Sequence, residues 1–276
     1  MKKFLIWMLG LVTMLSSCSE AVDMLIEGNG GQQVTFSLSA DGLEQTRATA
    51  DGLRYVMAIY DETGTNKVVA ETVFDQSTFS VRLDQGKYTC LFWADHGSAN
   101  YDAADLTAIT AKDNSADDAN AEAFYAKQGI TVTDGGTVNV TLSRAVAKVT
   151  LNETDRLVAG SITVTYNGFK DFNVSTGNGI NSGTLTQTIS FANVIEGTVA
   201  NPTKVGEFLL LANSGENYFS DFKVKYNSEA EKTITNVPVQ ANYVTNINGK
   251  FSVNVSQSFS ISINDTWADT NKEVGI

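Results

Sequence analysis

The stretch from Val138 to Leu151 changes its buried face partway along, and this change limits how the chain can fold. The apolar positions of its first part alternate with mostly polar residues, which predicts a half-buried strand. These positions are Val138, Val140, Leu142 and Val146. The apolar positions that follow have the opposite parity: Ala147, Val149 and Leu151. Such a strand either leaves one sandwich core and enters the next, or contains a bulge within one sheet, and both interpretations stay open.

Composition predicts an all-β chain with two domains. The 276 residues are too many for one small sandwich, and 42% of them are hydrophobic, which is enough for sizeable cores. Thr, Ser, Asn and Gly separate short apolar runs, and about seven runs in each half are typical of strands. The net charge of −12, without a basic aromatic patch, argues against nucleic acid as a partner.

The first 17 residues have the form of a signal peptide. Lys2 and Lys3 precede an apolar run over residues 4–14, which is shorter than the ~20 residues needed to span a bilayer. Residues 15–18 read Leu-Ser-Ser-Cys and resemble the bacterial lipobox, whose cysteine receives acyl chains such as palmitate. We therefore predict an exported lipoprotein anchored through Cys18, and the alternative is an ordinary signal peptide with a chance cysteine.

A tether, a strand and a polar loop follow the leader. Residues 18–32 form the tether, and residues 33–39 predict the first strand, with Val34, Phe36 and Leu38 on its apolar face. The loop at residues 41–52 is small and polar and carries one basic residue, Arg47. Exposed loops of this composition are where proteases cut.

Residues 101–127 depart from the strand pattern. Two Ala-rich segments, residues 102–106 and 118–127, carry Asp at capping positions. They predict either short helices inserted into the first half of the chain or an ordered long connection.

Residues that could support catalysis are scarce. His96 is the only histidine, it lies in a turn-like sequence, and no catalytic signature accompanies it. Cys90 lies in an apolar strand and is interpreted as a small buried hydrophobe. We predict that the protein is not an enzyme and has neither a cofactor nor a metal site.

Five short features together resemble the fimbrillin family, the shaft and accessory subunits of type V pili in Bacteroidetes. They are the lipobox at Cys18 and the segments at residues 46–48, 123–125, 142–149 and 237–249. The last two segments are the most specific. Val244 departs from the basic residue expected before Thr245, which puts the subfamily in doubt.

The resemblance implies a fold and an assembly mechanism. The fold is two transthyretin-like β-sandwich domains in tandem, residues 33–146 and 147–276, with the short helical insertions in the first. The precursor would reach the cell surface as an outer-membrane lipoprotein, where a trypsin-like protease would cut the Arg47–Ala48 bond. Loss of the first strand would open a groove that a strand of another subunit fills, and repetition would give a fibre.

The C-terminal segment, near residues 257–276, contains a candidate donor strand. Phe259, Ile261 and Ile263 alternate and are followed by Trp267. The last strand of the C-terminal sandwich would have the same pattern, so both interpretations stay open.

The predicted function is a structural subunit, shaft or tip, of a cell-surface fimbria that serves adhesion. Its partners would be other fimbrial subunits, the outer membrane through the lipid of the precursor, and a host or bacterial surface ligand. The alternative is a permanently lipid-anchored module that binds a glycan or a host ligand.

Overall fold

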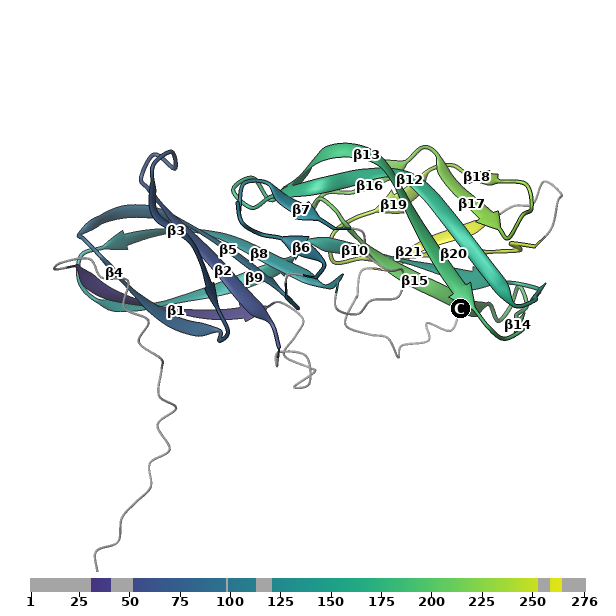
Figure 1. The fold of residues 1–276 in the computed structure, drawn as a ribbon, viewed down its shortest axis with the longest axis horizontal. Coiled ribbons are helices and arrows are strands. Elements are labelled where there is room, and N and C mark those ends of the chain that lie inside the picture. Colours follow the sequence, from purple (N-terminus) through teal and green to yellow (C-terminus); the bar gives the residue numbers. More distant parts are fainter. Residues whose placement is uncertain (1–30, 41–51, 98, 113–120, 253–258, 265–276) are drawn as a thin grey trace, which may run out of the picture.

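The computed structural model describes residues 31–40, 52–97, 99–112, 121–252 and 259–264. The regular elements of these residues are β-strands, so the all-β prediction is confirmed. The strands form an N-terminal group and a C-terminal group that lie end to end along the longest axis of the molecule (Figure 1).

The N-terminal group is one folded sheet with strand order β3-β2-β5-β8-β9-β1-β4. Its strands are β1 (Gln32–Ala40), β2 (Arg54–Asp61), β3 (Lys67–Phe74), β4 (Thr78–Leu83), β5 (Gly86–Asp95), β8 (Ala123–Val132) and β9 (Gly136–Arg144). β8 and β9 pair only through Phe124–Arg144 and Tyr125–Ser143, and the sheet folds over at this short junction. Its two halves face each other and enclose the N-terminal core.

The C-terminal group contains two facing sheets around the C-terminal core. The first has the order β15-β10-β20-β21; its strands are β10 (Val146–Glu153), β15 (Thr203–Leu211), β20 (Val244–Gly249) and β21 (Ser260–Asn264). The second has the order β18-β17-β12-β7-β6, with β13 paired to β12. Its strands are β6 (Tyr101–Asp102), β7 (Ile109–Ala111), β12 (Gly160–Asn173), β13 (Asn178–Phe191), β17 (Phe222–Tyr226) and β18 (Lys232–Ile234). Two small pairs complete the group: β11 (Arg156–Leu157) with β14 (Ile195–Glu196), and β16 (Asn217–Phe219) with β19 (Val237–Val239).

The change of buried face in the central stretch coincides with the passage of the chain from one core to another. β9 places Val140 and Leu142 in the N-terminal core. The apolar residues of β10 that follow Val146 lie in the C-terminal core. Val146 itself belongs to a third cluster together with Ala145, the residue between the two strands. One stretch of chain therefore supplies side chains to three packed clusters.

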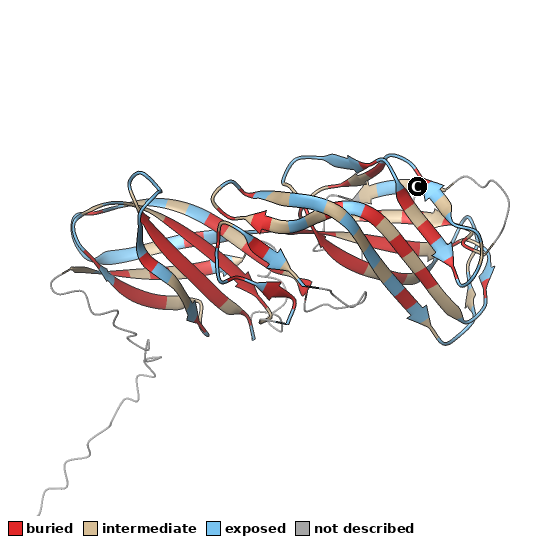
Figure 2. Ribbon diagram, turned by 45° about the horizontal axis from the view of Figure 1, so that its top comes forward, coloured by how far each residue is buried: buried red, intermediate tan, exposed pale blue. Residues whose placement is uncertain are grey.

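The third cluster joins the two groups of strands. It combines side chains from the outer face of β2 and β5 with others from β6, β7, β12 and β15, and these residues are among those shown as buried in Figure 2. Trp93 is fully buried there, with its ring centroid 5.3 Å from that of Tyr101 and 5.9 Å from that of Phe172.

The predicted helical insertions are wrong for the residues that the structure describes. Residues 101–111 form β6, a turn and β7, and β8 already begins at Ala123, while residues 113–120 lie outside the described part. Tyr101, Leu106 and Ile109 are buried in the third cluster, and β7 pairs with β12. These tertiary contacts outweigh the helix propensity of the alanines, which is less than ~1 kcal/mol per residue.

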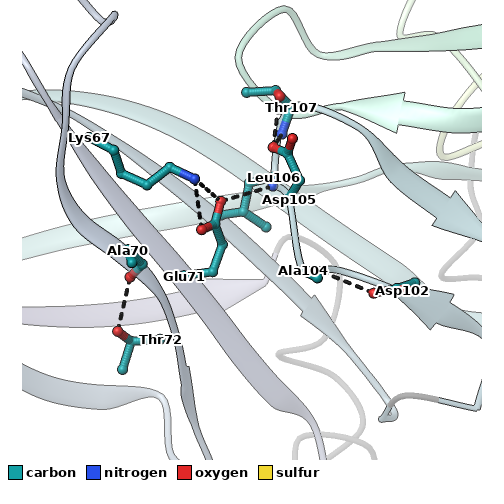
Figure 3. A network of polar contacts seen from close by, with 9 residues as sticks. All are labelled: Lys67, Ala70, Glu71, Thr72, Asp102, Ala104, Asp105, Leu106 and Thr107. Atoms are coloured by element: carbon teal, nitrogen blue, oxygen red, sulfur yellow. Dashed lines mark hydrogen bonds and ion pairs between the residues drawn. The ribbon is translucent and has the colours of Figure 1, made fainter.

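Polar contacts tie the connection between β6 and β7 to β3 (Figure 3). The Lys67 ammonium donates to Glu71 Oε1 at 2.6 Å, and the N–H of Leu106 donates to the same oxygen at 3.4 Å. The hydrogen bond to Glu71 raises the pKa of Lys67. Asp105 accepts the N–H of Thr107 at 2.8 Å, which closes the turn. A segment that pairs with the C-terminal sheet is thus also held by the N-terminal sheet.

Candidate strand-exchange site

β1 is buried along one face by three apolar side chains. Val34, Phe36 and Leu38 are 3%, 0% and 6% exposed. The Phe36 ring centroid lies 5.9 Å from that of Phe79 in β4 and 5.2 Å from that of Phe92 in β5. Phe36 therefore packs against both halves of the folded sheet. Burial of three such side chains contributes about 5–9 kcal/mol.

Both backbone edges of β1 are paired. It runs parallel to β9 over seven residue pairs and antiparallel to β4 over six. Within the described part of the chain, β4 has no strand partner other than β1. Removal of β1 would leave unpaired N–H and C=O groups on β9 and β4, beside three vacated apolar sites. A single extended strand could satisfy both edges and fill these sites.

The connection from β1 to β2 contains the predicted cleavage bond. β1 ends at Ala40 and β2 begins at Arg54, so the Arg47–Ala48 bond lies between them, outside the described residues. β1 and β2 are not neighbours in the sheet. One cut in this connection would therefore leave β1 with no covalent link to β2 and the strands that follow.

Arg54 anchors the start of β2 directly after that connection. Its Nε and Nη2 atoms donate to the two carboxylate oxygens of Asp95 at 2.6 and 2.9 Å, and Nη2 also donates to the carbonyl oxygen of Tyr101. Asp95 is fully buried and accepts two further hydrogen bonds at 2.8 Å, from the indole of Trp93 and the N–H of Gly97. Sequence analysis missed this pair, because its members are 41 residues apart and match no motif.

The candidate donor segment forms the edge strand of its own C-terminal sheet. β21 pairs antiparallel with β20 over five residue pairs and has no second neighbour among the described strands. Phe259 and Ile261 pack partly buried against the C-terminal core, Ile263 is half-buried, and the Phe259 ring lies directly over Gly249. Trp267 lies outside the described residues. The donor role of this segment stays a prediction.

The structure describes one of the two cysteines. Cys18 lies outside the described residues, whereas Cys90 is fully buried in β5, as predicted. Burial raises the pKa of the Cys90 thiol to about 12.

We expect iodoacetamide to leave Cys90 unlabelled in the native chain near pH ~8, because the thiolate is the reactive form and burial disfavours it. The same thiol should react fully in guanidinium chloride. Intact-mass spectrometry of a chain that starts after Cys18 measures both states, since Cys90 is then the only cysteine. Rapid labelling of the native chain would contradict this expectation.

Metal-binding clusters and membrane-spanning helices were sought among the described residues. There, no group of three or more His, Cys, Asp and Glu side chains could hold a metal ion. His96 lies at a bend immediately after β5. A search of the same residues for helices finds none long and apolar enough to cross a membrane.

Comparison with known proteins identifies the family of the chain. A family model matches residues 27–274, which is nearly the whole chain. The chain belongs to DUF6562, a family of unknown function. A search of curated proteins found no match to this DUF6562 chain.

Solved structures share the fold of the DUF6562 chain at low sequence identity. A proposed adhesin from Bacteroides thetaiotaomicron is 12% identical, with a TM-score of 0.55 over 85% of this chain and 97% of that one. A proposed cell adhesion protein from Bacteroides ovatus is 11% identical, with a TM-score of 0.51 over 86% and 98%. The tip fimbrial protein Mfa3 from Porphyromonas gingivalis, with a C-terminal truncation, is 13% identical, with a TM-score of 0.51 over 85% and 98%.

Proposed function

We propose that this DUF6562 chain is a structural subunit, shaft or tip, of a cell-surface fimbria of the fimbrillin type, and that it serves adhesion rather than catalysis. The precursor is an outer-membrane lipoprotein anchored through Cys18, and the partners of the mature chain are other fimbrial subunits. The position of β1 supports this most strongly, because β1 is a fully paired strand followed by a connection that contains Arg47. The fold shared with a tip fimbrial protein also supports it.

Assembly proceeds by replacement of β1. Cleavage of the Arg47–Ala48 bond releases residues 18–47 of the lipidated precursor, which include β1. A strand from another subunit then pairs with β9 and β4 and places alternate side chains where Val34, Phe36 and Leu38 were. Because each subunit both offers such a site and supplies a strand, repetition of the joint gives a fibre.

The donor strand comes from the C-terminal region, residues 257–276. β21 has one paired edge and a half-buried face, whereas β1 has two paired edges and three buried side chains. Release of β21 from β20 therefore costs less free energy than release of β1 from its site. A donor that enters the β1 site gains a second paired edge and deeper burial of its alternate side chains.

Two transthyretin-like β-sandwich domains, residues 33–146 and 147–276, make up the subunit. The third cluster packs them against each other, and residues 101–111 cross from the first domain to pair with the second. A joint with this much buried apolar surface resists bending, which suits a subunit that transmits tension along a fibre.

An Arg47→Ala variant tests the proposal. It should keep β1 and remain monomeric, because the exchange site never opens. Arg156→Ala, at an exposed arginine of the C-terminal group, is the matched control and should polymerise normally. Gel electrophoresis without boiling measures the ladder of polymers. An unchanged ladder for Arg47→Ala would reject the mechanism and favour the permanently lipid-anchored binding module.

A further inference from the structure

β13 is a long edge strand without the usual protection of an edge. It spans 14 residues, and its only hydrogen-bonded neighbour among the described strands is β12. Its sequence contains neither a charged residue nor a proline. Every other edge strand in the described part of the chain carries a charged residue or a proline, or has five residues or fewer. Because charges, prolines and short lengths normally keep an edge from pairing, β13 is open to a further strand.

The hydrogen bonds of β12 show which backbone groups of β13 face the open edge. The N–H of Ser161 donates to Oδ1 of Asn227 and its carbonyl oxygen accepts the N–H of Asn227, both at 2.9 Å, so Ser161 points away from β13. Directions alternate along a strand, so the even-numbered residues of β12 are the ones that bond β13. They lie opposite odd-numbered residues of β13 in a regular register. The N–H and C=O groups of the even-numbered residues from 182 to 190 therefore face the open edge.

The sequence of this edge is self-complementary. The residues whose backbone faces the edge all have exposed hydroxyl side chains: Ser182, Thr184, Thr186, Thr188 and Ser190. This series reads the same in both directions about Thr186. If two copies paired antiparallel there, Thr186 would lie opposite Thr186, each other Thr opposite a Thr, and each Ser opposite a Ser. Hydroxyl pairs of this kind are favourable across strands.

The residues between these positions fit the same two-fold pairing. Gly183 would lie opposite Ile189 of the other copy, and Leu185 opposite Gln187. These would be non-hydrogen-bonded positions, where side chains approach most closely, so a glycine opposite an isoleucine leaves room for the larger side chain. A cavity of about 330 Å³ lies between residues 184–187 of β13 and residues 209–211 of β15. The edge strand of the facing sheet therefore does not fill the space beside the centre of β13.

We propose that β13 pairs antiparallel with β13 of a second copy of this chain, about a two-fold axis at Thr186. Each opposed pair of edge-facing residues exchanges two backbone hydrogen bonds, and the two sheets join into one. A second copy fits because the series is symmetric, and because an uncharged edge brings no like charges together in a chain of net charge −12. The contact closes on itself and joins two chains only. Between subunits of neighbouring fibres it would link the fibres side by side, and this consequence alone rests on the proposed function.

Sedimentation velocity of the chain without its leader, residues 19–276, tests the proposal. We expect a monomer–dimer equilibrium with a dissociation constant in the range of about 10–300 µM. Thr186→Lys and Thr186→Glu should each raise that constant about tenfold, because the two-fold axis brings the two introduced like charges directly opposite each other. An equimolar mixture of the two variants should dimerise at least as well as the parent chain, because opposite charges then meet. Misfolding of a variant would not be repaired by mixing.

Thr233→Lys and Thr233→Glu are the matched controls. Thr233 is an exposed threonine of β18, an edge strand of the same sheet on the other side of β12, and its variants should dimerise as the parent chain does. Three results would overturn the proposal: a parent chain that stays monomeric up to about 1 mM, a dimer that the Thr186 variants leave unchanged, or a mixture of these variants that stays monomeric. Because β1 remains in place in all these chains, such a failure is distinct from a failure of strand exchange.

Discussion

A chain that begins at Ala48 should bind a synthetic peptide of residues 31–40 and regain most of the stability that it loses without β1. Loss of β1 removes three buried side chains, which contribute about 5–9 kcal/mol. That amount is comparable to the 5–15 kcal/mol by which whole domains are typically stable. We therefore expect the N-terminal core of the shortened chain to melt at a much lower temperature. The peptide should raise that temperature, with a stabilisation that grows as the logarithm of its concentration above Kd. Differential scanning calorimetry with and without peptide measures both effects.

The matched control is the same peptide with Phe36→Ala. Phe36 is fully buried and contacts the rings of Phe79 and Phe92, so its truncation should weaken binding by about 3–5 kcal/mol. Two observations would contradict the exchange site: a shortened chain that melts like the full chain, or equal binding of the two peptides.

Asp95→Ala should destabilise the chain by about 3–5 kcal/mol, because it breaks a buried ion pair and leaves the partner charge behind. Asp95 is 0% exposed and Arg54 is 20% exposed. The substitution also leaves the indole of Trp93 without its acceptor. Urea denaturation monitored by tryptophan fluorescence measures the loss, and we expect the start of β2 to become accessible to proteases.

Glu62→Ala is the control for this prediction. Glu62 pairs with Lys87 at 2.8 Å, but the two side chains are 66% and 61% exposed. Removal of this exposed ion pair should cost only about 0–1 kcal/mol. Equal destabilisation by the two substitutions would show that the Asp95 network does not anchor β2.

Strands with alternating sequences could be predicted because their signal is local. The first strand was expected at residues 33–39 and is observed at Gln32–Ala40, with the three expected side chains buried. The parity change after Val146 is likewise a property of adjacent residues, and the structure places the two parities in different clusters.

Features that depend on distant residues were not predictable from the same patterns. The alanines and aspartates of residues 101–111 suggest helix, but burial of Tyr101 and Ile109 against the C-terminal group decides their conformation. The Arg54–Asp95 ion pair likewise joins side chains that are 41 residues apart. In both cases the deciding partner lies far along the chain, where no local sequence pattern indicates it.

The N-terminal residue of the protein recovered from the cell surface, identified by mass spectrometry, decides whether β1 is replaced. Strand exchange at the β1 site predicts a chain that begins at Ala48 and lacks residues 1–47. A chain that begins at a lipidated Cys18 would contradict it, because β1 would then remain in place between β9 and β4.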